Sequence, residues 1–582
     1  KIYLKNFTIK ITLIIDVLFL FNCFYLLNML YCKAVNKNKK IKGDQRFIMK
    51  RLSKLFLMLV FSLLFLVACG EKAKEEVKTE GTEKKTLTIS WNEDIGFLNP
   101  HAYLPDQFVT QGMVYEGLVN YGENGEILPS LAESWEISED GKTYTFHLRK
   151  GVKFSDGSDF NANNVKKNFD SIFLNKERHS WFGLTDHIKS YRAVDENTFE
   201  LILDEAYTPT LYDLAMIRPI RFLADAGFPD DGDTYKGIKA SIGTGPWILK
   251  EHKKDEYAIF EKNPNYWGKK PILDEVIIKI IPDAETRALQ FEAGELDMIY
   301  GNGLISYDTF KSYEEDPKYK TAISEPMSTR LLMFNTTSGV LNDINLRYAL
   351  TYATDKKAIS EGILNGIEKP ADTIFAPNMP HSKQDLKPFE YNLDKAKEYI
   401  EKAGYKMGKE FYEKDGQVLT LVFPYIATKT LDKQIAEYIQ GQWKKIGVNV
   451  EIKALEEKNF WEETDDLKYN VMLNYSWGAP WDPHAYINAM ATVAENGNPD
   501  YEAQLGLPMK KELDEKIHQV LVEANPEKVE QLYKEILTTL HEQAVYVPLT
   551  YQSLIAVYRD NLTGVRFMPQ EYELPLSFID KK

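Results

Sequence analysis

Apolar and polar residues alternate along several short segments of the chain, which is the pattern of half-buried β-strands. Residues 86–91, TLTISW, follow this period of two, and two further alternating runs within residues 131–149 flank Asp140-Gly141. Because an Asp-Gly pair readily forms the tight turn between antiparallel strands, residues 131–149 predict a β-hairpin. A second hairpin is predicted to begin at Gly243–Trp247 and to close at Asn263–Gly268.

Segments with helical spacing follow these strands. One helix is predicted from Asn163 onward, and another is predicted to be capped by Asp283 and to end at Gly294. The apolar positions of Leu346–Lys357 predict an amphipathic helix. Helical and strand segments alternate from there to Glu530, which favours a mixed α/β fold.

The residues before the first strand have a different character. A basic start, Met49–Lys54, is followed by an apolar run, Leu55–Val67, and then by Ala68-Cys69. This pattern predicts a lipoprotein signal peptide over residues 49–69, with Cys69 as the lipidated residue. Acyl chains on Cys69 would hold a soluble body at a membrane surface. The alternative is an ordinary secretory signal in which Cys69 is incidental.

Residues 1–48 precede that signal and include an apolar run, Ile11–Tyr31, that is long enough to span a bilayer. A spanning helix directly before a signal peptide has no clear purpose, so we expect residues 1–48 to be upstream translated sequence. The alternative is a genuine additional anchor. Residues 70–85 are rich in Lys, Glu, Gly and Thr and predict a flexible tether.

Composition narrows the class of protein. All three cysteines, Cys23, Cys32 and Cys69, precede the body, which excludes disulfide scaffolds, zinc–thiolate sites and cysteine catalysis from it. A net charge of −15 argues against a nucleic-acid partner, and 13% aromatic residues favour an aromatic-lined binding protein. A body of roughly 500 residues is expected to form two lobes. Since the sequence lacks the common nucleophile, zinc-helix and phosphate-loop motifs, we expect no enzyme; an extracytoplasmic hydrolase is the alternative.

Four sequence motifs follow one another along the chain: SEDGKTYTFHLRKGVKFSDG, GTGPW, NPNYWG and DAETRALQFEAGELD. Their order and separations resemble the peptide- and nickel-binding class of extracytoplasmic solute-binding proteins, over about residues 86–575. The resemblance implies a two-lobed, periplasmic-binding-protein-like α/β fold with a ligand cleft between the lobes. Lobe I is then expected at 86–325 and 549–582, and lobe II at 326–548.

The same resemblance implies a role and a location. The protein is expected to be the monomeric, lipid-anchored receptor of an ABC importer, in the periplasm or on the outer face of the cytoplasmic membrane. Its partners would be a membrane permease and a cytoplasmic ATPase.

Candidate ligand-binding residues also follow from the resemblance. Arg178 and Arg218 match arginines that, in the nickel-binding members, hold the carboxylates of a metal chelate. A guanidinium binds a carboxylate through two parallel hydrogen bonds and stays charged at physiological pH. Because two arginines repel a bare dication, the expected ligand is a nickel ion wrapped in a small anionic organic chelator. The alternative at this step is another small polyacid. The alternative for each arginine is an ion pair within its own lobe, and Arg221 is expected to be structural.

Aromatic residues complete the predicted site. Tyr103, Trp181, Trp477 and Trp481 match cleft-lining positions of the nickel binders, where flat rings can enclose a chelate and exclude water. The alternative for each tryptophan is packing in the core. Phe108 stands where the best-known pattern has a methionine.

The phrase around Trp477 separates nickel binders from peptide binders. Peptide binders place an aspartate here to receive the α-ammonium group of the peptide, whereas this chain has Pro480, with Asp482 nearby. This favours nickel, and a dipeptide or oligopeptide remains the alternative. No haem-attachment motif is present.

Histidines are the least certain part of the predicted site. Imidazole is a preferred ligand of nickel, but the loop at 491–500, where nickel binders can supply one, contains no histidine. His484 is a weak candidate for a metal ligand, since a lone histidine after Asp-Pro is more often structural. His101 and His179 are likewise interpreted as structural.

Overall fold

The computed structural model describes residues 84–102, 108–179, 181–477, 482–493 and 497–582. These residues belong to one compact unit, Lys84–Lys582, and residues 1–83 are a separate unit outside the description. The predicted signal peptide, Cys69 and residues 70–83 of the predicted tether therefore lie outside the described residues. The last tether residue, Lys85, is described and donates its backbone N–H to Asp274 at 2.8 Å. Within the described residues, none of the helices combines the length and apolar character needed to cross a membrane.

The first sheet contains the predicted strand at residues 86–91 and the second predicted hairpin, and both predictions are confirmed. Its order is β1-β10-β9-β8, with β1 parallel to β10 and the other pairs antiparallel. Leu87 and Ile89 of β1 are buried, as the alternation requires. The strands are β1 (Thr86–Trp91), β8 (Trp247–Lys253), β9 (Tyr257–Lys262) and β10 (Glu275–Ile280), with the short pair β21 (Leu562–Thr563) and β22 (Asp580–Lys581) contributing to the same core.

A second antiparallel sheet, β4-β5-β7-β6, contains the hairpin predicted at Asp140-Gly141. Gly141 has a φ of 69°, a conformation that glycine adopts without strain. Asn161 caps the helix predicted after this hairpin by accepting from the backbone N–H groups of Asn163 and Asn164. The elements are β4 (Ala132–Ile137), β5 (Thr143–Leu148), β6 (Ile188–Asp195), β7 (Thr198–Leu203) and α4 (Ala162–Phe173).

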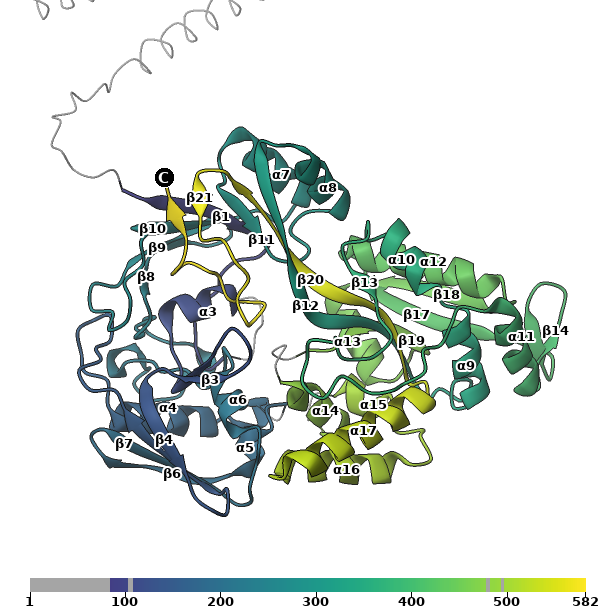
Figure 1. Ribbon diagram of the computed structural model, residues 1–582, viewed down its shortest axis with the longest axis horizontal. Coiled ribbons are helices and arrows are strands. Elements are labelled where there is room, and N and C mark those ends of the chain that lie inside the picture. The colour runs from purple at the N-terminus through teal and green to yellow at the C-terminus, as the bar shows by residue number, and fades with distance from the viewer. Residues whose placement is uncertain (1–83, 103–107, 180, 478–481, 494–496) are drawn as a thin grey trace, which may run out of the picture. The chain divides into compact units, whose positions relative to one another are not determined.

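Shorter elements connect these two sheets. They are α3 (Phe108–Val114), β2 (Val119–Tyr121), β3 (Ile127–Pro129), α5 (Leu184–His187), α6 (Thr210–Ala215) and the 3₁₀ turns η2 (Lys176–His179), η3 (Asp225–Gly227) and η4 (Thr234–Lys236). In Figure 1 both sheets and these connections occupy the purple-to-blue side of the ribbon.

Two long strands, β12 (Tyr319–Phe334) and β20 (Tyr546–Arg559), pair along almost their whole length. They run through the middle of Figure 1 and belong to the sheet β11-β20-β12-β19, in which β13 also pairs with β20. The two positions where the chain is predicted to pass between the lobes, 325/326 and 548/549, lie within these paired strands. Both are next to irregularities in the strand register. The lobe boundaries remain a prediction. The other strands are β11 (Met298–Tyr300), β13 (Lys369–Pro370) and β19 (Val471–Tyr475).

The predicted helix Leu346–Lys357 is two helices in the structure. The first, α9 (Ile344–Tyr352), ends before Thr354, whose hydroxyl donates to the carbonyl of Leu350. Asp355 then accepts from the N–H of Ala358 and caps α10 (Lys356–Gly362). The prediction of one helix was therefore wrong at Asp355, which lies within the amphipathic segment but caps a second helix.

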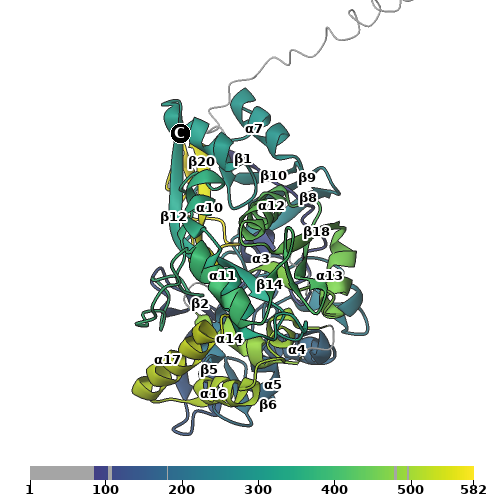
Figure 2. The same cartoon turned by 90° about the vertical axis from the view of Figure 1, so that its right-hand side faces the viewer.

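The remaining elements complete the expected α/β region and end in a helical layer. The α/β elements are α7 (Ala284–Ala293), α8 (Tyr307–Glu315), α11 (Leu393–Lys402), β14 (Lys406–Met407), β15 (Tyr412–Lys414), β16 (Gln417–Val418), β17 (Thr420–Ile426), α12 (Thr430–Lys444), β18 (Asn449–Leu455) and α13 (Glu457–Asp465). The helical layer consists of α14 (Pro483–Ala491), α15 (Pro499–Glu502), α16 (Lys510–Val522) and α17 (Pro526–Glu542), and α16 lies against α17 in both views (Figures 1 and 2).

The two predicted lobes touch at this helical layer. Thr208 donates its backbone N–H to the carbonyl of Leu521 at 2.8 Å and its hydroxyl to the carbonyl of Glu523 at 3.0 Å. Buried residues of α4, α14, α16 and α17 belong to one continuous hydrophobic core. The structure therefore holds the two predicted lobes in contact on this side.

Candidate ligand-binding site

Arg218 lies between two aromatic rings. Its guanidinium carbon is 4.3 Å from the ring centre of Phe108 and 4.4 Å from that of Trp181. Phe108 is the first residue of α3, and Trp181 comes shortly after η2. Stacking uses the faces of the guanidinium plane, whereas a carboxylate binds at its edge, so the same arginine can do both.

Tyr572, from the C-terminal segment, extends this arrangement. Its ring meets that of Phe108 edge-on, with the ring centres 4.8 Å apart. The position where the best-known pattern has methionine therefore carries a ring that contacts both Arg218 and a distant tyrosine. Three parts of the chain that are far apart in sequence meet here.

Arg178 stacks on a different ring. Its guanidinium carbon lies 4.3 Å from the ring centre of Tyr235, and its Nη1 donates to the backbone carbonyl of Tyr235 at 3.4 Å. The charges of Arg178 and Arg218 both act on His179, whose pKa burial and these cations lower to about 3. Both predicted arginines therefore lie close enough to His179 for their charges, with that of His101, to act on it.

Trp477 is partly a core residue. Its indole Nε1 donates to Asp500 Oδ2 at 3.3 Å, and its ring meets Tyr486 edge-on. Burial raises the pKa of Asp500 to about 6. Trp477 and Trp181 are both half-buried and pack against the same hydrophobic core. Tyr103, Pro480 and Trp481 lie outside the described residues.

His484 lies in a buried setting at the start of α14. Its Nδ1 is 3.1 Å from Asp482 Oδ1, and its ring meets those of His381 and Tyr533 edge-on. In the described part of the chain its Nε2 has no hydrogen-bond partner. The predicted role of His484 as a metal ligand stays a prediction.

The expected structural residues have structural surroundings. His101 is 3% exposed and hydrogen-bonds Thr234 and Asn168, and burial lowers its pKa to about 4. Arg221 is buried and donates to three backbone carbonyls, those of Leu214, Ala215 and Ile220. These bonds support the interpretation that Arg221 is the more structural residue when it is compared with Arg218.

The sequence did not indicate Tyr235 or Tyr572 as site residues. Each belongs to a segment without a recognisable motif, and only the tertiary fold brings it to Arg178 or to Phe108. The sequence also did not indicate a cluster of His187, Asp204 and Glu205, the one group of histidine and acidic side chains among the described residues with spacing suited to a metal ion. Asp204 and Glu205 are exposed, and such groups commonly carry no ion.

The fold and the arginine-and-aromatic site define a two-lobed solute-binding protein. Residues 126–498 match the family model described as bacterial extracellular solute-binding proteins, family 5. The chain belongs to that family.

Two relatives represent the two ligand types that the sequence left open. The nickel-binding periplasmic protein of Escherichia coli (strain K12) is 40% identical over 496 residues, which cover 85% of this chain and 94% of that protein. The dipeptide-binding protein of the same organism is 28% identical over 464 residues, which cover 75% of this chain and 83% of that protein.

Solved structures show the same fold. NikA from Brucella suis, in complex with Fe(III)-EDTA, is 41% identical with a TM-score of 0.83, and the match covers 85% of this chain and 100% of that one. NikZ from Campylobacter jejuni, in complex with Ni(L-His), is 25% identical with a TM-score of 0.74, and the match covers 86% of this chain and 100% of that one. The predicted two-lobed α/β fold is confirmed.

Proposed function

We propose that this protein is the substrate-binding component of an ABC importer and that it captures nickel as an anionic chelate. The observation that carries the proposal is the placement of Arg218 between Phe108 and Trp181, with Arg178 acting on the same region. The 40% identity to a nickel-binding periplasmic protein supports the metal. The complexes of NikA with Fe(III)-EDTA and of NikZ with Ni(L-His) support a chelated form of it.

The proposed mechanism assigns charge to the arginines and walls to the aromatic rings. Arg178 and Arg218 receive carboxylates of the chelator, while Tyr103, Trp181, Trp477 and Trp481 enclose it. Closing the lobes can be favoured only by the difference in ligand affinity between the closed and open forms. The closed form then delivers the chelate to a membrane permease driven by an ATPase.

The protein is a solute-binding protein by family, and we propose that it acts outside the cytoplasm as a monomer tethered through Cys69. The second candidate ligand is a dipeptide or oligopeptide. The dipeptide-binding relative favours it, as does Asp482, a buried carboxylate that could receive an ammonium group. In the described part of the chain, the Oδ2 atom of Asp482 has no hydrogen-bond partner.

Calorimetry on the purified protein distinguishes these ligands. Separate titrations use nickel alone, histidine alone, nickel with histidine, and a mixed dipeptide pool. Heat of binding only when nickel and histidine are both present supports the proposal. Saturable binding of dipeptides without metal would overturn it and would assign the protein to the peptide binders.

A further inference from the structure

A cavity of about 160 Å³ lies behind the wall that carries Phe108 and Arg218. Its lining includes the sequence neighbours of three site residues: Val109 follows Phe108, Ile217 precedes Arg218, and Glu573 follows Tyr572. Residues of β8 and of the segment before β2 complete the lining. Its lining includes neither Phe108 nor Arg218. The cavity is therefore distinct from the candidate ligand-binding site, although both share α3.

Two buried hydrogen-bond donors in this lining lack acceptors. Tyr115 and Trp247 are each 1% exposed, and within the described residues neither the Tyr115 hydroxyl nor the Trp247 Nε1 has a partner. A buried donor without an acceptor costs roughly 1–3 kcal/mol. Both donors thus favour a guest that carries a hydrogen-bond acceptor.

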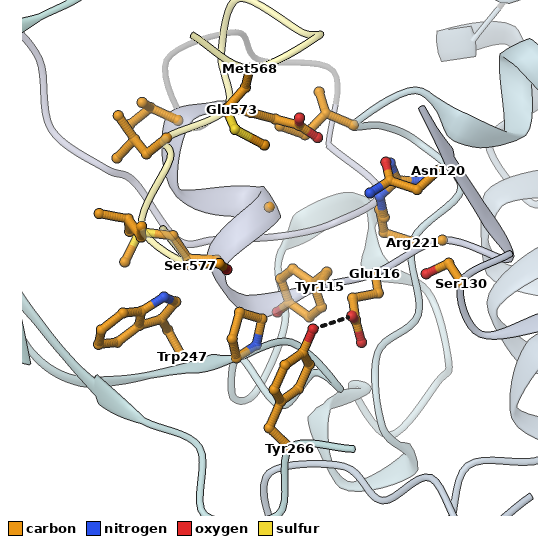
Figure 3. A pocket seen from close by; sticks show the side chains of 18 residues that line it. Tyr115, Glu116, Asn120, Ser130, Arg221, Trp247, Tyr266, Met568, Glu573 and Ser577 are labelled. Atoms are coloured by element: carbon orange, nitrogen blue, oxygen red, sulfur yellow. Dashed lines mark hydrogen bonds between the residues drawn. The ribbon is translucent and has the colours of Figure 1, made fainter. Parts of the chain in front are cut away.

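The lining of the cavity carries two glutamate carboxyl groups and one arginine. Glu116 accepts from Trp267, Thr244 and Tyr266, and Glu573 accepts from Gln570. Figure 3 shows both carboxyl groups and the Arg221 guanidinium among the lining side chains.

Among the described residues, Arg221 is the one cation whose charge lowers the pKa of both Glu116 and Glu573. Burial nevertheless raises the pKa of each glutamate to about 7. With both carboxylates ionised, Arg221 leaves one negative charge uncompensated.

We propose that this cavity is a second binding site, for a small organic molecule that carries one positive charge and one hydrogen-bond acceptor. The cationic end of the guest lies against Glu116 and Glu573. Its positive charge and that of Arg221 together balance the two carboxylates. The acceptor end receives the Tyr115 hydroxyl and the Trp247 indole N–H. A cavity of about 150 Å³ holds a molecule the size of benzene, so a guest of this size is accommodated.

The competing occupant is water. At roughly 30 Å³ per molecule, about five waters would fill the volume and satisfy the two donors. Water carries no net charge, so a hydrated cavity balances Arg221 only when one of the two glutamates is protonated. Recognition that depends on the charge of the guest therefore separates the proposal from simple hydration.

Three matched probes test it: ethanolammonium, propylammonium and 1-propanol, which have the same chain length. Ethanolammonium carries both the charge and an acceptor, propylammonium lacks the acceptor, and 1-propanol lacks the charge. Fluorine NMR of protein labelled with 5-fluorotryptophan reports on the cavity, because Trp247→Phe identifies the Trp247 resonance among the nine tryptophans. We expect a saturable shift of that resonance with ethanolammonium, binding about tenfold weaker for propylammonium, and none for 1-propanol.

A matched pair of variants controls for surface charge. Glu573→Gln removes one lining carboxylate and should weaken ethanolammonium binding by about tenfold, whereas Glu139→Gln, at an exposed position of the hairpin turn, should leave it unchanged. If Glu573→Gln does not fold, the titrations of the unmodified protein with the three probes still test the proposal. An equal response to all three probes, or no shift of the Trp247 resonance, overturns the proposal.

The outcome is independent of the proposed nickel function. Adding nickel with histidine should leave the ethanolammonium titration unchanged, because the two sites have separate linings. Displacement of ethanolammonium by the nickel chelate would show that the cavity belongs to the main site, and would overturn the proposal of a second one.

Discussion

Arg218 and Arg221 stand three positions apart and belong to two different regions of the molecule. On one side, Arg218 is half-buried and held by the faces of two aromatic rings. On the other side, Arg221 is buried and held by three backbone carbonyls, beside two glutamates. Stacking keeps a guanidinium oriented while its edge can meet a carboxylate, whereas bonding to carbonyls fixes the edge itself. The partners of an arginine, more than its position in the sequence, thus distinguish a binding role from a structural one.

The largest effect is expected from removing the structural arginine. Arg221→Met leaves three carbonyls without their donor and removes the cation that faces Glu116 and Glu573. Breaking such a buried set should lower the free energy of unfolding by about 3–5 kcal/mol. Denaturant unfolding followed by circular dichroism measures it.

Arg218→Met is the matched control for this experiment. It removes a half-buried side chain from between two rings and should cost no more than about 1 kcal/mol of stability. Equal destabilisation by the two substitutions would contradict the comparison between the two regions.

The second effect is the pH dependence of stability on the buried side. Burial raises the pKa of Glu573 from 4.5, the value expected for the unfolded chain, to about 7. Because the folded pKa is the higher one, the folded state favours the protonated carboxyl. Its stability should be highest below pH 4.5, fall as the pH rises toward 7, and stay level above that value.

Glu573→Gln cannot ionise and should lessen this fall. Because part of the Glu573 side chain is exposed, we discount the full shift. We expect the fall in unfolding free energy between pH 4.5 and pH 8 to be about 2 kcal/mol smaller in Glu573→Gln than in the unmodified protein. Urea unfolding at pH 4.5, 6 and 8 measures this fall in both proteins, because these pH values cover the interval from 4.5 to about 7 in which the carboxyl group titrates. Glu139→Gln should retain the slope of the unmodified protein, and an unchanged slope for Glu573→Gln would show that this carboxyl is not the cause.

The third effect concerns ligand affinity and the stacked arginine. Arg218→Ala should weaken capture of nickel–histidine by at least about tenfold, which is about 1.4 kcal/mol. Arg218→Lys keeps the charge but loses the planar fork and its stacking, so most of the loss should remain. Calorimetric titration of the three proteins measures it, and full affinity in Arg218→Ala would remove this residue from the site.

The sequence predicted more of the fold than of the site. Local signals with a short range were sufficient for the Asp140-Gly141 hairpin and for the helix capped by Asp283, and both are present. The helix predicted over Leu346–Lys357 was wrong in one respect, because apolar periodicity continued across Asp355, whose side chain caps a new helix. The spacing of apolar residues shows which face of a helix is buried. It does not show where one helix ends and the backbone hydrogen bonds of the next begin.

The site depends on contacts that no local pattern carries. The resemblance indicated Arg178 and Arg218, but two tyrosines beside them come from segments without a recognisable motif: Tyr235, on which Arg178 stacks, and Tyr572, whose ring contacts Phe108. The cavity behind α3 was also not predicted, because its lining joins residues near the start of the body to the C-terminal segment. Such sites become visible only when the chain has folded back on itself.

The smallest expected effect tests whether the two arginines act as equals. Arg178 stacks on Tyr235, which is 53% exposed, so this contact should be worth only about 0.5–1 kcal/mol. Tyr235→Ala should therefore weaken nickel–histidine binding by about two- to fivefold, through a less well oriented Arg178. It should lower the free energy of unfolding by no more than about 1 kcal/mol. Tyr235→Phe keeps the ring and is the control, with affinity close to that of the unmodified protein. A loss as large as that of Arg218→Ala would mean that Arg178 contributes as much as Arg218. It would also mean that one exposed ring can orient a ligand-binding guanidinium as firmly as a buried ring and a half-buried ring together.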